Sequence, residues 1–98
     1  MAYQDPKNVD SPRGRWRLIE VLRNGGDESD SLAVGMWDGR PALAMRWNGS
    51  SEEQGVGNPQ SRGLPTWFIL PDWCRAGVLG KADLDPQALN RAKAILGV

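Results

Sequence analysis

Four residues in the middle of the chain have the chemistry needed to bind a nucleic acid strand. Trp37 and Arg40 lie close together, Arg46 follows a few positions later, and Arg62 lies further on in a polar loop. An aromatic ring can stack on a base, and a guanidinium can bind phosphate through two N–H groups. The combination indicates a surface for single-stranded nucleic acid, provided that the fold brings these side chains to one place.

The residue inventory disfavours catalysis and metal binding. The chain has no histidine, so its one cysteine, Cys74, has no imidazole to act as a base. Asp27, Glu28 and Asp30 gather in one loop but lack the ordered spacing of a calcium loop. Glycine-rich phosphate motifs and Cys/His metal patterns are absent from the sequence. We expect a non-catalytic protein without cofactor or metal, and we interpret Cys74 as a small buried apolar residue.

Length and charge narrow the class of protein. The 98 residues suit one domain, and 12 basic residues against 12 acidic ones give zero net charge. Any attraction for a polyanion would therefore be local, and residues 24–38 carry four acids and no base. A single cysteine excludes an internal disulfide, and no stretch approaches the ~18 apolar residues of a membrane helix. We expect a soluble, cytoplasmic protein without membrane contact.

Residues 31–48 predict the β-hairpin that would position Trp37 and Arg40. Two alternating runs flank Asp38-Gly39, a preferred two-residue type I′ turn because both turn positions need a positive φ. This turn fixes the register. The expected pairs are Trp37 with Arg40, Gly35 with Ala42, Val34 with Leu43, Ala33 with Ala44, and Leu32 with Met45.

The two faces of this hairpin differ in side-chain size. One is a core face, made of Leu32, Val34, Met36, Leu43, Met45 and Trp47. The other, which we call the small-residue floor, consists of Ala33, Gly35, Ala42 and Ala44, with Trp37, Arg40 and Arg46 at its ends. Such a floor receives either a packing partner or a ligand, and the sequence leaves both open.

The remaining elements predict an α+β fold with a four-stranded antiparallel sheet and a C-terminal helix packed on one face. Residues 15–23 and 66–70 are apolar on both faces and short enough to be strands. Residues 86–96 predict the helix, with Asp85 as N-cap, Pro86 at the first position and Gly97 after the last. Its packing stripe is expected to contain Leu89, Ala92 and Leu96.

The connecting segments complete the expected domain organisation. Residues 1–14 are polar and aperiodic, which indicates a flexible arm before a single domain at 15–98. Residues 49–65 predict a long polar loop of the kind that is functional or mobile. Pro71 ends the fourth strand and opens a short turn that Gly77 is expected to stop.

The hairpin resembles that of the PC4-like transcriptional coactivators. The similar residues are Gly35-Met36-Trp37-Asp38-Gly39-Arg40-Pro41 and Ala44-Met45-Arg46-Trp47, within a similarity that covers roughly residues 32–75. The resemblance implies a small homodimer whose curved sheets hold single-stranded DNA, with Arg40, Arg46, Trp47 and Arg62 as positions to inspect. Ala42 and Leu64 stand where the family usually has lysines. Its single long helix is replaced by a turn at Pro71, breaks at Gly77 and Gly80, and a second helix.

Two functional classes follow. The first is a non-catalytic protein that binds single-stranded nucleic acid, with Trp37, Arg40, Arg46, Trp47 and Arg62 as site residues and the 49–65 loop beside them. The second is a small protein-interaction module, which the neutral charge and five tryptophans suit equally well. In either case one helix can cover only one face of the sheet, so we expect a homodimer through the sheet edge or the helix stripe.

Overall fold

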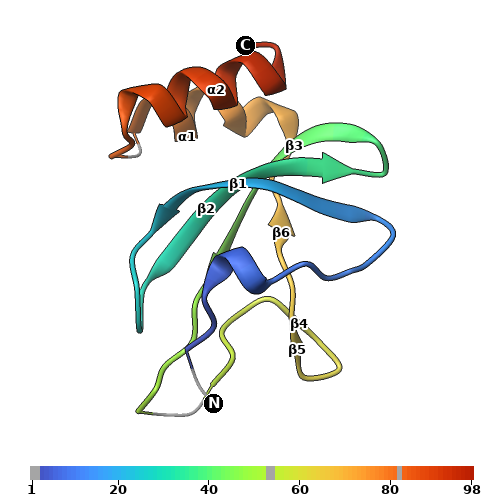
Figure 1. Ribbon diagram of the computed structural model, residues 1–98, viewed down its shortest axis with the longest axis vertical. Coiled ribbons are helices and arrows are strands. Elements are labelled where there is room, and N and C mark those ends of the chain that lie inside the picture. The colour runs from blue at the N-terminus through green and yellow to red at the C-terminus, as the bar shows by residue number, and fades with distance from the viewer. Residues whose placement is uncertain (1–2, 53–54, 82) are drawn as a thin grey trace.

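The computed structural model describes residues 3–52, 55–81 and 83–98 as a four-stranded antiparallel sheet with helices on one face (Figure 1). The sheet has the order β1 (Trp16–Asn24), β2 (Asp30–Trp37), β3 (Arg40–Trp47) and β6 (Phe68–Ile69). Strands β4 (Gln60–Ser61) and β5 (Leu64–Pro65) form a separate hairpin. The helical segments are η1 (Pro6–Asn8), η2 (Asp72–Cys74), α1 (Arg75–Lys81) and α2 (Pro86–Leu96). The predicted α+β fold is confirmed.

The β2–β3 hairpin has the predicted register at every pair. Trp37 lies opposite Arg40, Gly35 opposite Ala42, and the remaining partners follow without a shift. Asp38 and Gly39 both have positive φ, 49° and 81°, as a type I′ turn requires. Local turn chemistry and side-chain alternation are therefore sufficient to determine this unit.

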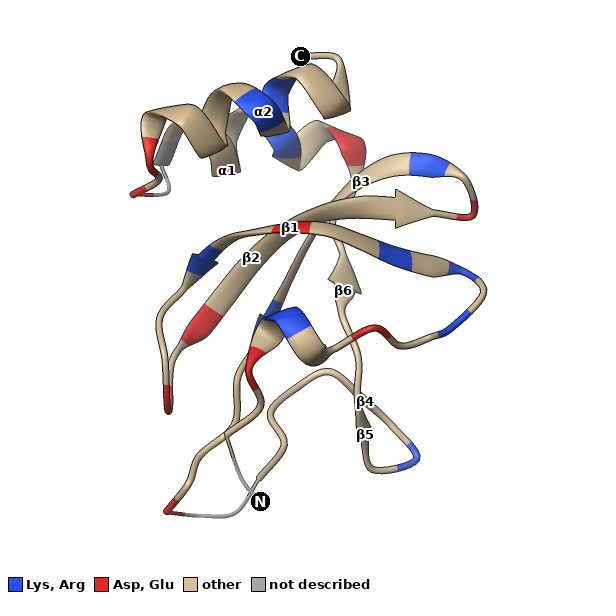
Figure 2. Ribbon diagram, in the orientation of Figure 1, with Lys and Arg blue, Asp and Glu red and all other residues tan. Residues whose placement is uncertain are grey.

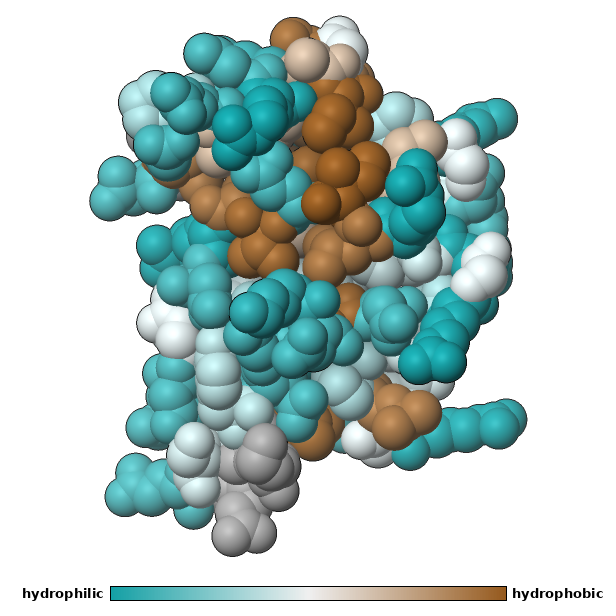
Figure 3. Space-filling view, viewed as in Figure 1, coloured by the Kyte–Doolittle hydropathy of each residue, from teal (hydrophilic) through white to brown (hydrophobic). Residues whose placement is uncertain are grey.

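Helices α1 and α2 cover the face of the sheet that carries Leu32, Val34 and Leu43 (Figure 1). Asp85 accepts hydrogen bonds from the amides of Gln87 and Ala88, and Gly97 ends α2 in the left-handed conformation. The buried stripe of α2 contains Ala88, Ala92 and Leu96, whereas Leu89 is only partly buried. The space-filling view shows apolar residues gathered where the helices meet the sheet (Figure 3).

The small-residue floor is covered by the protein's own tryptophans. Trp16 and Trp67 lie on it with their ring centroids 6.1 Å apart, and Ala33, Ala42 and Ala44 are buried beneath them. A Cβ added to Gly35 would stand only 2.6 Å from the Trp16 ring, so the floor is small because a ring occupies the space above it. The sequence left open whether the floor receives a packing partner or a ligand, and the structure shows a packing partner from within the chain.

The N-terminal segment, predicted as a flexible arm, contributes to this second core. Pro6 and Val9 are buried, and Asp5 caps the short helix η1 by accepting from the amide of Lys7. The indole Nε1 of Trp67 donates to the Val9 carbonyl at 2.6 Å. The arm therefore packs against the floor side of the sheet.

Strand β1, predicted from residues 15–23, does not alternate regularly between the two faces of the sheet. Its register against β2 shifts between Leu18 and Glu20 and again between Val21 and Arg23. Each bulge adds one residue, which moves the following side chains to the opposite face. Leu22 consequently enters the helix-side core, whereas Ile19 is exposed.

Two connections contain more structure than expected. Gly77 does not stop the turn after Pro71, because α1 continues through it to Lys81. The 49–65 segment contains the β4–β5 hairpin and isolated bridges that join Trp47 to Asn58 and Ser50 to Gly55.

Among the described residues, no helix has the length and apolar character required to cross a membrane.

Candidate functional site

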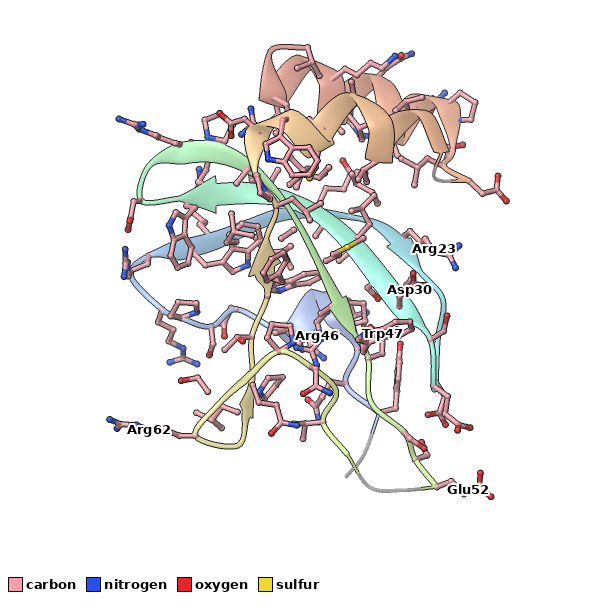
Figure 4. All side chains as sticks on the ribbon, turned by 180° about the vertical axis from the view of Figure 1, so that it is seen from behind. Arg23, Asp30, Arg46, Trp47, Glu52 and Arg62 are labelled. Atoms are coloured by element: carbon pink, nitrogen blue, oxygen red, sulfur yellow. The ribbon has the colours of Figure 1, made fainter. Side chains whose placement is uncertain are left out.

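The five predicted site residues fall into three separate places, and Figure 4 labels the three of them that lie away from the β2–β3 turn. Trp37 and Arg40 flank the turn at one end of the β2–β3 hairpin, while Arg46 and Trp47 lie at the other end of β3. At the usual rise of a strand, these ends are about 24 Å apart. Arg62 occupies the β4–β5 turn and points away from the sheet (Figure 4). The fold therefore does not assemble the five side chains into one surface.

Arg46 is a buried structural residue. Only 3% of it is exposed, and its two terminal nitrogens donate to the carbonyls of Thr66 and Val56, with a longer contact to Pro59. Burial lowers the pKa of its guanidinium to about 10, so the group is still charged at neutral pH. Because Arg46 faces carbonyls inside the fold, the expectation that it contacts phosphate is not supported by its position.

Trp47 was expected in the core, yet 60% of it is exposed. The helices do not cover this corner of the sheet, so the Trp47 side chain is open to solvent. Phe68 lies beside it and is 56% exposed. The two rings and Met45 border a cavity of about 380 Å³, which we call the aromatic pocket. Its other lining residues are Asp30, Arg46, Asn58 and Pro59.

A second cavity lies next to Trp47. It measures about 320 Å³, and we call it the polar pocket because most of the residues that line it are polar. They are Glu28, Ser29, Ser50, Asn58 and Gln60, together with Trp47 and three glycines. The backbone of Trp47 exchanges hydrogen bonds of 2.7 and 3.2 Å with that of Asn58. Trp47 is thus fixed at its backbone and lines both pockets.

The hairpin end is the more basic end of the molecule (Figure 2). The Arg15 guanidinium lies 4.8 Å from the centroid of the Trp37 ring and bonds both oxygens of Asp38 at 3.1 and 2.8 Å. This pairing raises the pKa of Arg15 and lowers the pKa of Asp38. Arg17 and Arg40 are exposed and form no ion pair with any residue that the structure describes.

Cys74, the one cysteine of the sequence, lies on the helix side of the sheet. It packs against the helix-side core as a partly buried residue. Within residues 3–52, 55–81 and 83–98, no three His, Cys, Asp or Glu side chains are grouped so as to hold a metal ion.

Sequence reasoning missed two residues of these pockets. Phe68 was assigned to a strand with both faces buried, and Glu28 to a solvated loop. In the structure Phe68 pairs with Met45, so the two side chains lie on the same face of the sheet. The alternation of residues 66–70 would predict this face for Phe68 once the pairing of the two strands is known. Nothing in the local sequence places Glu28 beside Trp47.

Comparison with protein-family models, with curated protein sequences and with solved structures finds no match to this chain. The resemblance to PC4-like coactivators is therefore an interpretation of the hairpin residues, and the geometry of the site carries the functional argument.

Proposed function

We propose that this protein is a non-catalytic recognition module that binds an apolar segment of a partner protein in the aromatic pocket. The observation that carries the proposal is the exposure of the Trp47 and Phe68 rings on a sheet whose two faces are otherwise packed. Large aromatic side chains beside a cavity are the usual energetic centres of protein interfaces.

The charges near the aromatic pocket favour a polypeptide over a nucleic acid. Asp30 lines the pocket, where Arg23 pairs with it at 3.1 Å. The carboxylates of Glu28 and Glu52, which form no ion pair with any described residue, lie on the neighbouring loops together with Asp27. The Arg46 guanidinium is turned inward to the carbonyls of Thr66 and Val56. Exposed carboxylates repel phosphate, whereas an apolar side chain with a neutral or basic neighbour meets no such barrier.

Single-stranded nucleic acid is the second candidate, and the hairpin end is the surface that favours it. Arg17 and Arg40 have no acidic partner among the described residues, and Trp37 offers a partly exposed ring next to them. The pairing of Arg15 with Asp38 reduces the positive charge of this end. The cationic surface is therefore small, which makes this the weaker of the two proposals.

Selection of binding peptides from a random display library tests the main proposal. We expect enriched peptides with an apolar or aromatic residue, whose affinity falls about tenfold or more with Phe68→Ala. Trp73→Ala is the matched control, because Trp73 is also a highly exposed aromatic residue but lies outside the pocket. Peptides that lose affinity equally with both variants, or no enrichment at all, would overturn the assignment of the pocket.

A single-stranded oligothymidine, titrated by tryptophan fluorescence at low and moderate salt, tests the second candidate. Phosphate-driven binding weakens steeply as salt rises, whereas binding at an apolar pocket changes little. Quenching at low salt that disappears in Arg17→Ala and Arg40→Ala, and not in Phe68→Ala, would favour nucleic acid over a polypeptide.

A homodimer is retained as a proposal, through the sheet edge, which is one of the two contacts expected. The floor and the helix stripe are both used within one chain, which leaves the edge strands β1 and β6 for a second copy. Light scattering over a dilution series tests it. A mass of one chain, 10.8 kDa, at tens of micromolar would exclude it.

A further inference from the structure

We infer that the polar pocket binds a basic side chain of the partner segment, with its cationic group on the ring of Trp47 beside Glu28. The inference rests on the proposed function and adds what the segment must contain: a Lys or Arg close to its apolar residue. The shared chemistry of the two side chains is a monovalent organic cation.

The position of Trp47 provides the first support. Trp47 is a lining residue of the polar pocket as well as of the aromatic pocket, and it is exposed. A cation within about 6 Å of an indole centroid is attracted by the ring's quadrupole, most strongly for tryptophan. The same chain already shows this contact, between Arg15 and Trp37.

The distribution of carboxylates provides the second support. Glu28 lines the polar pocket, is exposed, and forms no ion pair with any described residue. Asp30, on the aromatic side, is already paired with Arg23 at 3.1 Å. The uncompensated negative charge therefore lies on the polar side of Trp47, where a cation would be neutralised.

The loop that carries Glu28 is held against the end of β3. The Glu28 amide donates to the Gly49 carbonyl at 2.9 Å, and the Asn48 amide donates to the Ser29 carbonyl at 2.8 Å. Asn48 is buried and donates to the Gly26 carbonyl at 2.8 Å. These bonds connect the loop to the strand that carries Trp47, so the backbone of Glu28 is held close to the end of that strand before a ligand arrives.

The backbone conformation of Glu28 is one that a glutamate adopts only at a cost in free energy. Its φ of 59° lies in the left-handed region, which glycine occupies at lower cost. Its side chain forms no hydrogen bond or ion pair with the described residues, so no such contact explains a glutamate at this position. Strained positions of this kind concentrate at binding sites.

The experiment follows the indole and backbone amide signals of the ¹⁵N-labelled 98-residue chain during titration with N-methylguanidinium and with methylammonium. N-methylurea, which has a similar shape and no charge, is the control ligand. We expect both cations to shift the Trp47 indole and the Glu28 amide, and N-methylurea to leave them unchanged. The comparison of the two cations decides between an arginine and a lysine preference.

Three variants make the assignment specific. Glu28→Gln is expected to weaken cation binding about fivefold. Trp47→Leu keeps an apolar surface but removes the indole, and it is expected to abolish the shift of the Glu28 amide. Glu52→Gln is the matched control, because it removes the same charge from a nearby exposed position that does not line the pocket. A folded amide spectrum for each variant excludes loss of structure as the cause.

The outcomes separate this inference from the proposed function. Equal weakening by Glu28→Gln and Glu52→Gln, or equal shifts with N-methylurea, would overturn the cation site. If selected peptides bind through Phe68 but carry no enriched Lys or Arg, the proposed function stands and this inference fails. If the cations shift Trp47 while no peptide is enriched, the cation site stands and the docking proposal fails.

Discussion

Glu20 on β1 and Arg91 on α2 share two hydrogen bonds of 2.9 and 2.7 Å, although 71 residues separate them in the chain. The first bulge of β1 turns Glu20 toward the helix face, opposite Val34. The pair joins the edge of the sheet to the helix that covers it, and the hydrogen bonds from Arg91 lower the pKa of Glu20.

This pair predicts a loss of stability in acid. A carboxyl whose pKa is lowered by folding takes up its proton more readily in the unfolded chain, so its stabilisation is lost as the pH falls below ~4.3. We expect Glu20→Gln to reduce the difference in the free energy of unfolding between pH 7 and pH 3, as measured by urea denaturation. Glu52→Gln is the control. An unchanged difference in Glu20→Gln would show that the pair adds nothing.

The buried guanidinium of Arg46 predicts a structural effect. Arg46→Met keeps the volume but leaves the carbonyls of Val56 and Thr66 without their donor, and each such loss costs about 1–3 kcal/mol. We expect a total loss of about 3 kcal/mol in urea denaturation, together with faster amide exchange near residues 55–59. Arg62→Met, at an exposed turn position, should change stability by less than about 0.5 kcal/mol. A similar small change in Arg46→Met would contradict the assigned role.

The packing of the N-terminal segment predicts that Val9 is a core residue. Val9→Asp would bury an unpaired carboxylate next to Trp67, and we expect a loss of about 3 kcal/mol of stability with a red shift of tryptophan emission. Asn8→Asp adds the same charge at an exposed neighbouring position and is expected to have little effect. Comparable unfolding midpoints for the two variants would mean that the segment is not docked in solution.

The left-handed conformation of Glu28 predicts a stabilising substitution. Glu28→Gly should raise the free energy of unfolding by about 0.5–1 kcal/mol, because glycine adopts a φ of 59° at little cost. Glu52→Gly, at a residue without positive φ, should not stabilise. Thermal unfolding measures both variants. A fall in stability for Glu28→Gly would show that the glutamate side chain contributes contacts to the fold.

The sequence predicted those features that depend on neighbouring residues. Asp38-Gly39 determined the turn and with it the register from Leu32 to Met45. Asp85, Pro86 and Gly97 determined the two ends of α2. Turn and cap preferences act over a few residues, so the local sequence contains all of the information that they need.

The candidate site was predicted only in part. The alternation along a strand predicts the side of the sheet on which a side chain lies, but not what packs against that side. Trp47 was named as a position to inspect through the resemblance, but the sequence did not show that the helices leave this corner of the sheet open beside Phe68. Arg46 was selected for its charge, and the carbonyls that it binds belong to residues 10 and 20 positions away.

By itself, the sequence determined the hairpin, the capped helix and the α+β class, since hydrogen-bonding and φ preferences between near neighbours set them. Only the tertiary structure decided that Trp16 and Trp67 close the small-residue floor, that two bulges redirect β1, and that Trp47 stays exposed. These features depend on contacts between residues that are far apart in the sequence. Such contacts form only when the whole chain packs, so no short stretch of sequence predicts them.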